Sequence, residues 1–152
     1  MRSRLTRGMT LAAPLILVLV AAGCGSSSKS TPALTKAEFL KKGNAICKNG
    51  NQQINAAAKK TFPKNKKPSQ AQLTQFATRT LAPTIQAEIS GVKALGAPQG
   101  DEAQVKAMVD SAQAALDKGK KNPALLAGNN NLFAQSNKLT KAYGLTACGG
   151  GG

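Results

Sequence analysis

The chain has 152 residues, of which 21 are Lys or Arg and six are Asp or Glu, for a formal net charge of +15 at pH 7. It contains no His and no Trp. The missing His argues against catalysis by a histidine acid or base and against the common zinc sites. A positive charge of this size favours anionic partners and does not determine the fold.

Residues 1–23 have the parts of an export signal: a basic start, an apolar run over residues 9–22 and small residues before Cys24. The basic residues are Arg2, Arg4 and Arg7. A cysteine at this point resembles the lipobox of bacterial lipoproteins. The resemblance implies cleavage after Gly23, a diacylglyceryl group on the sulfur of Cys24, and a mature protein anchored to the outer face of the cell membrane.

This segment has two alternative interpretations. A membrane-spanning helix needs about 20 apolar residues, and this run is shorter and contains Pro14. An ordinary secretory signal stays open, because Ala21 and Gly23 also suit ordinary signal peptidase. The usual lipobox has Leu where this chain has Ala21.

The cysteine count supports lipidation. The chain has three cysteines, and an odd number in an exported protein requires an explanation. If Cys24 is lipidated, Cys47 and Cys148 remain as a pair, and an oxidising location permits a disulfide between them. The alternative is a free, buried thiol at Cys47.

The composition divides the chain into four parts. We expect a signal peptide over residues 1–23, a flexible tether over 24–34, a helical domain over 35–148 and a disordered glycine tail over 149–152. The tether is small, polar and contains Pro32, as is typical of flexible linkers.

A first helix is predicted over residues 36–61. Thr35 and Glu38 form a capping-box pattern. Apolar residues follow at helical spacing and predict a buried stripe: Phe39, Leu40, Ile46, Cys47, Ile54, Ala57 and Ala58. Gly43 and Gly50 fall on or beside this stripe, where they weaken the helix but let a neighbour approach closely.

A second helix is predicted over residues 70–95. Ser69 and Gln72 form another capping-box pattern. The apolar stripe continues on both sides of Pro83, so we expect one kinked helix rather than two separate ones.

Two further helices are predicted in the C-terminal half. Asp101 and Glu102 open one, where negative charge favours the helix N-terminus. A short turn follows over residues 123–126, and a fourth helix over residues 130–143 ends at Gly144 in a left-handed conformation.

Four helices with short loops predict an all-α, antiparallel four-helix bundle with a kinked second helix, stapled by one disulfide. Strand patterns are poor throughout.

Three short stretches resemble an uncharacterised family of small exported helical proteins of actinobacteria, many of which resemble lipoproteins. They are Ala45-Ile46-Cys47, Pro98-Gln99-Gly100-Asp101-Glu102, and Tyr143-Gly144-Leu145 followed by Cys148-Gly149. The resemblance implies the helical fold and the pairing of a first-helix cysteine with a C-terminal cysteine. It implies no functional site.

No catalytic constellation is predicted. The six acidic residues show no evident inward-facing pair, and Asp101 with Glu102 is better explained as helix-start charge. The glycines at residues 149–152 precede no helix and do not form a phosphate-binding loop. We therefore expect a non-enzymatic protein without metal or cofactor.

Lysines provide the one remaining pattern. They form two groups, one near the end of the first helix and one near the end of the third: Lys59, Lys60, Lys64, Lys66 and Lys67, and Lys118, Lys120 and Lys121. In an antiparallel bundle both groups lie at the same end, opposite Glu38, Asp101 and Glu102, and predict an anion-binding pole. The alternative is that helix C-termini favour cations and loops are solvated.

The expected function is that of an extracytoplasmic lipoprotein, held to the membrane by its lipid, that binds an anionic wall polymer, lipid head groups or an acidic protein. The alternative is a structural or assembly subunit of an envelope complex. Nucleic acid is not expected as a partner, because no aromatic residues alternate with the lysines for base stacking.

Overall fold

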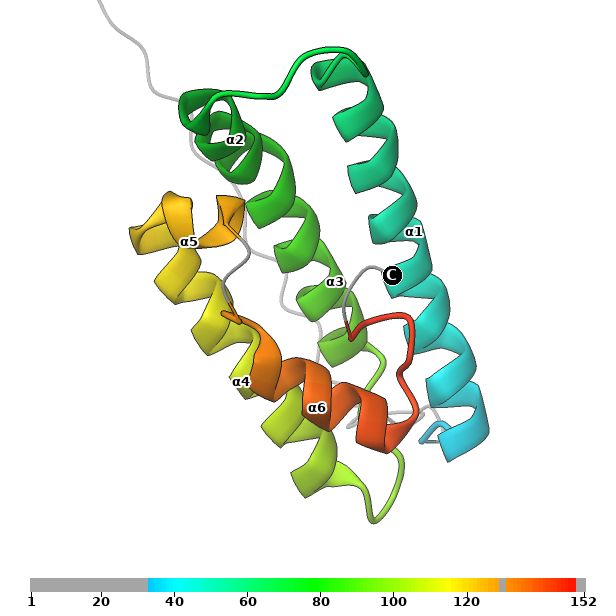
Figure 1. The fold of residues 1–152 in the computed structure, drawn as a ribbon. Helices are drawn as coiled ribbons and strands as arrows, with labels where there is room; N and C mark the ends of the chain where they lie inside the picture. Colours follow the sequence, from blue (N-terminus) through cyan, green and yellow to red (C-terminus); the bar gives the residue numbers. More distant parts are fainter. Residues whose placement is uncertain (1–32, 129–130, 150–152) are drawn as a thin grey trace, which may run out of the picture. The chain divides into compact units, whose positions relative to one another are not determined.

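The computed structural model describes residues 33–128 and 131–149 (Figure 1). This part of the chain is helical and contains no strand. The predicted signal over residues 1–23, Cys24, the tether up to residue 32 and the glycines at 150–152 lie outside the described residues. Within the described part, no helix combines the length and hydropathy that crossing a membrane requires.

The helical segments follow one another with short connections (Figure 1). They are α1 (Lys36–Thr61), α2 (Gln70–Phe76), the π-helical η1 (Ala77–Leu81), α3 (Ala82–Ala94), α4 (Glu102–Lys121), α5 (Pro123–Ala127) and α6 (Ala134–Tyr143). The first helix has the predicted bounds, and the short turn predicted over residues 123–126 is the helical segment α5, which ends one residue later.

Both predicted capping boxes are present. At α1 the Glu38 backbone N–H donates to the Thr35 hydroxyl, and the Thr35 N–H donates to the Glu38 carboxylate at 2.9 Å. Ser69 and Gln72 make the same reciprocal pair at α2. Each box satisfies backbone groups that a helix start leaves without an intrahelical partner.

Residues 70–94 are helical without a break, and the predicted interruption is a π turn rather than a simple kink. The Ala82 N–H donates to the Ala77 carbonyl, five residues back. Pro83 has no N–H to donate and its ring crowds the preceding turn. A π turn widens the helix locally and accommodates such a defect.

The last helix begins later than predicted, at Ala134 instead of near residue 130. The Ala134 N–H donates to the Asn131 carbonyl at 3.0 Å, which closes a turn at this point before the helix starts. The C-terminal end agrees with the prediction: Gly144 has φ 108°, and the Leu145 N–H donates to the Thr140 carbonyl at 2.8 Å.

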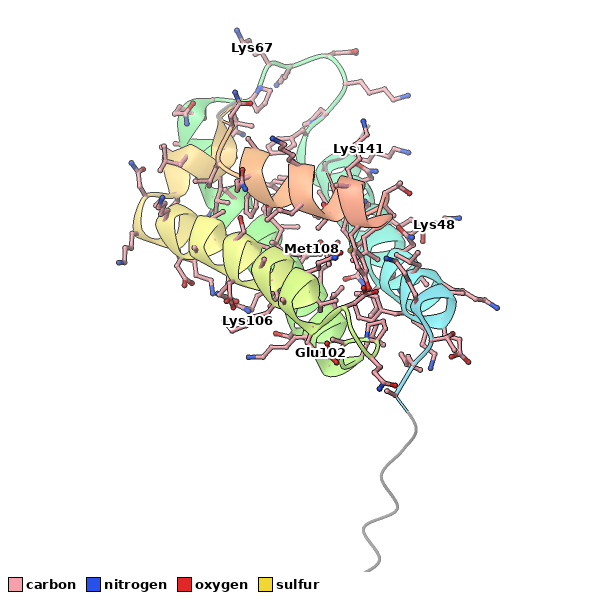
Figure 2. All side chains as sticks on the ribbon, turned by 90° about the horizontal axis from the view of Figure 1, so that it is seen from below. Lys48, Lys67, Glu102, Lys106, Met108 and Lys141 are labelled. Carbon is pink, nitrogen blue, oxygen red and sulfur yellow. A yellow bond between two sulfur atoms is a disulfide. The ribbon has the colours of Figure 1, made fainter. Side chains whose placement is uncertain are left out.

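The helices pack in pairs, most of which are not consecutive in the chain. α1 packs on α3, α3 on α4, and α4 on α6, while α2 packs on α5. In Figure 2 Met108 lies between the helices, whereas Lys48 and Lys67 project outward.

Two apolar clusters form the core. The larger one holds Phe39, Cys47, Val92, Val105, Met108, Tyr143 and Leu145. The smaller one holds Ala82, Ile89 and Leu116. Both clusters lie within the compact unit formed by residues 32–152, so we expect the chain from Ser30 onward to fold by itself.

The segment after α6 is fastened to α1 by three side chains of that helix, an arrangement we call the C-terminal clasp. Cys47 is bonded to Cys148, with 5.0 Å between their Cα atoms. Asn44 donates to the Gly144 carbonyl at 3.1 Å and accepts from the Ala147 N–H at 2.8 Å.

Asn51 completes the clasp by donating to the Ala147 carbonyl at 2.9 Å. Leu145 fits against Gly43, where a Cβ would lie 2.6 Å from its Cδ2 atom. The close approach expected for Gly43 is therefore confirmed. Gly149, the first residue of the glycine run, lies beside α6, because a Cβ there would be 3.2 Å from the Thr140 hydroxyl oxygen.

Asp101 contacts other helices, which its interpretation as negative charge at a helix start did not predict. Its side chain caps no helix N–H. Its carboxylate accepts a hydrogen bond from the Tyr143 hydroxyl at 2.5 Å and pairs with the Lys36 ammonium at 3.5 Å. Tyr143 also packs edge-to-face on Phe39, with ring centroids 5.9 Å apart. The starts of α1 and α4 and the end of α6 therefore meet.

Loss of the disulfide is expected to destabilise the domain strongly. A bond that closes a loop of about 100 residues contributes about 4–5 kcal/mol in the chain-entropy model. For the chain from Ser30 onward, replacing Cys47 and Cys148 together by Ser should lower the melting temperature by about 10–20 °C. Circular dichroism during heating measures this.

The helical signal of that variant should persist at low temperature, because the other core residues are unchanged. Thiol titration of the denatured, unreduced parent domain is the direct control. Two reactive thiols per chain, or an unchanged melting temperature in the variant, would contradict the expectation.

Candidate functional site

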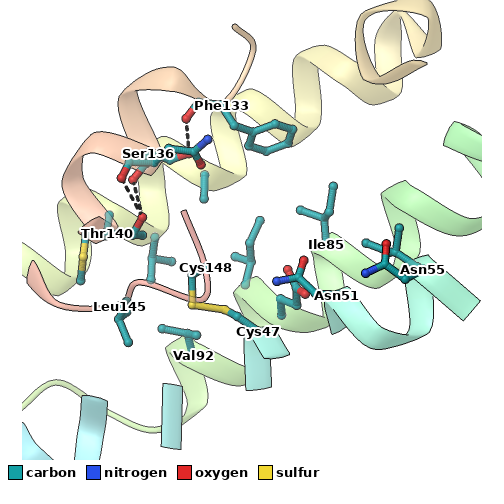
Figure 3. A pocket seen from close by; sticks show the side chains of 17 residues that line it. Cys47, Asn51, Asn55, Ile85, Val92, Phe133, Ser136, Thr140, Leu145 and Cys148 are labelled. Carbon is teal, nitrogen blue, oxygen red and sulfur yellow. Dashed lines mark hydrogen bonds between the residues drawn. A yellow bond between two sulfur atoms is a disulfide. The ribbon is translucent and has the colours of Figure 1, made fainter. Parts of the chain in front are cut away.

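A cavity of about 310 Å³ lies between the two core clusters (Figure 3). Its walls come from α1, α3, α4, α6 and the clasp. The apolar lining residues are Ile54, Ile85, Ile89, Val92, Met108, Val109, Ala112, Phe133 and Leu145, together with the bonded Cys47 and Cys148. The polar ones are Asn51, Asn55, Glu88, Ser136, Asn137 and Thr140.

Glu88 is the one carboxyl group in the lining. Its side chain lies against the backbone of α1 at Gly50, so closely that a Cβ at position 50 would collide with the carboxyl group. This confirms the expected close approach at Gly50. Within the described part of the chain, the buried Oε1 atom of Glu88 has no hydrogen-bond partner.

Burial raises the pKa of Glu88 to about 7 from an ordinary value of 4.5. Desolvation disfavours the charged form of a carboxyl group. The Glu88 side chain therefore changes charge near neutral pH, unlike an ordinary surface glutamate.

Three of the neighbouring polar groups use their donors elsewhere. Asn51 donates to the clasp. The Ser136 hydroxyl donates to the Phe133 carbonyl at 3.0 Å, and the Thr140 hydroxyl lies 3.0 Å from the Ser136 carbonyl (Figure 3). These groups shape the wall but leave the Glu88 carboxyl without a donor.

The cavity offers little for catalysis. Cys47 and Cys148 are bonded to each other, so neither presents a thiolate nucleophile in this state. The described residues contain no group of three or more His, Cys, Asp or Glu side chains able to hold a metal ion. What the arrangement does provide is an apolar space with one ionisable group, which suits binding.

The two lysine groups of the predicted anion-binding pole do not line this cavity. The first group occupies the end of α1 and the loop before α2, and the second occupies the last turn of α4. All eight side chains are on exposed residues, and none forms an ion pair within the described part of the chain. Lys120 donates to the Gln86 side chain at 2.6 Å.

In the chain, α2 directly follows the first lysine group and α5 directly follows the second, and these two helices pack on each other. Phe62 stacks edge-to-face on Phe76, with 5.0 Å between ring centroids, and so ties the end of α1 to α2. One acidic residue, Asp117, precedes the second group and accepts from Gln113. Glu38, Asp101 and Glu102 lie at the starts of α1 and α4.

Sequence reasoning missed the cavity and Glu88. A signal was present: Glu88 follows Ile85 by three residues and precedes Val92 by four, so it lies on the same helical stripe as the apolar residues. A carboxyl group on such a stripe opposite Gly50 indicates a buried acid. Which helix faces α3 at that point is not encoded in the local pattern.

Comparison of the chain with protein-family models, with curated proteins and with solved structures finds no match. The likeness to small exported actinobacterial proteins therefore stays a prediction from the short stretches that carry it.

The raised pKa of Glu88 makes the stability of the domain depend on pH. Between about pH 4.5 and 7 the folded state binds more protons at Glu88 than the unfolded state, so stability falls as pH rises through this window. The loss is about 1–2 kcal/mol, less than the full pKa shift implies, because solvent reaches part of the carboxyl group.

Glu88→Gln should remove this loss, so the variant melts at a higher temperature than the parent at pH 8 and similarly at pH 4.5. Denaturant unfolding at the two pH values measures the difference. Glu102→Gln is the matched control, since Glu102 is exposed. Identical pH dependence in the parent and Glu88→Gln would show that Glu88 titrates as a surface group.

Proposed function

We propose that the protein is an extracytoplasmic lipoprotein, anchored through Cys24, whose lysine-rich end binds an anionic component of the cell envelope. The observation that carries the binding proposal is the set of eight exposed lysines without ion pairs in the described part of the chain. The export pattern of residues 1–24 supports the location. The Cys47–Cys148 disulfide is consistent with it, because such bonds persist in oxidising compartments.

The proposal includes an antiparallel bundle, in which α1 and α4 end at the same pole. Two contacts support opposite directions for α1 and α3: Ile46 lies against Gly91, and Gly50 lies against Glu88. Residue numbers increase along α1 where they decrease along α3, as expected for two helices that run in opposite directions. The Lys36–Asp101 ion pair supports the same arrangement, because it brings the starts of α1 and α4 together.

Lysine determines the kind of binding expected. Its ammonium group is a flexible point charge, unlike the planar, bidentate guanidinium of arginine. A cluster of exposed lysines therefore attracts polyanions with little preference for their detailed shape. Salt weakens such an interaction, since the Debye length falls to about 3 Å at 1 M ionic strength.

Lipidation of Cys24 is the first test. Mass spectrometry of the membrane fraction is expected to find a mature N-terminus at Cys24 that carries acyl chains. Cys24→Ala should not be anchored, because it lacks the sulfur that receives the lipid. An unmodified parent protein recovered only from the medium would instead support the ordinary secretory signal.

Binding through the lysine-rich end is the second test. The chain from Ser30 onward should sediment with anionic phospholipid vesicles at low ionic strength and be released near 0.5 M salt. Replacing Lys59, Lys60, Lys64, Lys66 and Lys67 together by Gln should remove most of this binding without changing helicity, because these residues are exposed.

A matched control has the same net charge but keeps the lysine-rich end. It replaces five other exposed lysines by Gln: Lys41, Lys42, Lys48, Lys138 and Lys141. Equal losses in the two variants would mean that only total charge matters. Stoichiometric co-purification with an envelope protein, without vesicle or polymer binding, would favour the assembly-subunit alternative.

A further inference from the structure

The cavity beside Glu88 measures about 310 Å³ and is partly open to solvent. The space holds several water molecules. It lies at the lower end of the range of about 300–1,000 Å³ that small-molecule sites occupy.

Most of the wall is apolar. α3 contributes Ile85, Ile89 and Val92, and α4 contributes Met108 and Val109. Waters against such side chains have few hydrogen-bond partners, so an apolar ligand that displaces them gains affinity. A volume at the lower end of the range for such sites suits a small ligand.

Glu88 has no countercharge in this space. The lining residues from α1 are Cys47, Asn51, Ile54 and Asn55, those from α4 are Met108, Val109 and Ala112, and those from α6 are Ser136, Asn137 and Thr140. None of these is charged, and the two cysteines are bonded. No described Lys or Arg pairs with Glu88, although basic residues outnumber acidic ones by 21 to six in the chain.

We propose that the cavity binds a small apolar amine, whose aliphatic part lies between α3 and α4 and whose ammonium group pairs with the Glu88 carboxylate. Oε1 of Glu88 is closed off against Gly50 of α1, so the ammonium group of the ligand pairs with the other carboxylate oxygen, Oε2. Because burial raises the pKa of Glu88 to about 7, the empty site is partly protonated at neutral pH. An ammonium group favours the carboxylate, so each ligand that enters a protonated site releases one proton to solvent.

This site is independent of the lysine-rich end. The eight lysines there are not among the lining residues of the cavity. Their positive charge also prevents a cationic amine from binding at the lysine-rich end. Vesicle binding and amine binding are therefore separable properties of the same domain.

The test compares three probes that share an eight-carbon chain: octylamine, 1-octanol and octanoate. Calorimetric titration of the chain from Ser30 onward at pH 8 should show saturable binding of one octylamine, at least tenfold tighter than 1-octanol, with octanoate weakest. At pH 6 the octylamine heat should vary with the ionisation enthalpy of the buffer, which reports the released proton.

Two variants test separately the pairing of the ligand's ammonium group with Glu88 and the binding of its aliphatic chain in the cavity. Glu88→Gln should reduce octylamine affinity at least tenfold, to that of 1-octanol, and leave 1-octanol binding unchanged. Ala112→Met should weaken both probes by filling the cavity, while Ala114→Met, at an exposed position of α4, should weaken neither.

The parent protein alone can overturn the proposal. It is wrong if octylamine does not bind, binds no better than 1-octanol, or binds less tightly than octanoate. It is also wrong if octylamine binds Glu88→Gln as tightly as the parent, or if a folded Ala112→Met, verified by its melting curve, binds octylamine normally.

Discussion

The C-terminal clasp is the constraint on which the rest of the structure depends. Asn44, Cys47 and Asn51 are spaced by three and four residues, so they lie on one face of α1 and together hold the segment after α6. One covalent bond and three hydrogen bonds thus join the first and last parts of the domain. α6 packs on α4, and the clasp is what fastens its C-terminal end to α1.

The same constraint forms part of the cavity wall, because Cys47, Leu145 and Cys148 line the cavity. The clasp fixes α1 at one side and α4 with α6 at the other, and α3 packs against both α1 and α4. The core is low in aromatic residues, with four Phe, one Tyr and no Trp in the chain. Small and medium-sized side chains do not fill the space between the two clusters, and the covalent bond opposes the collapse that would close it.

Glycines on α1 determine what approaches it. Gly43 accommodates Leu145 of the clasp, and Gly50 accommodates Glu88 of α3. The two positions are one heptad apart on the buried face. They weaken the helix intrinsically, yet Gly43 allows the apolar contact with Leu145, and Gly50 allows the close approach of Glu88, the one carboxyl group in the cavity lining. The contrast between this buried acid and the exposed lysines is the main electrostatic feature of the domain.

The sequence by itself determined the local structure. Reciprocal side-chain and backbone hydrogen bonds placed the starts of α1 and α2 at Thr35 and Ser69, and the left-handed glycine at position 144 placed the end of α6, because these signals act within a few residues. It also predicted the helical class and the Cys47–Cys148 pair. The π turn before Pro83 and the late start of α6 at Ala134 were not predicted. Each depends on which carbonyl group a backbone N–H selects: Ala82 donates to Ala77, and Ala134 donates to Asn131.

Only the tertiary structure decided the site. The partners of Asn44, Asn51 and Asp101 lie between 42 and 103 residues away in the chain, so no local pattern identifies them. The cavity has the same origin, because a void is a property of how several helices fit together. Glu88 lies on an apolar stripe in the sequence, but its unpartnered carboxyl oxygen appears only when α1, with Gly50, packs against α3.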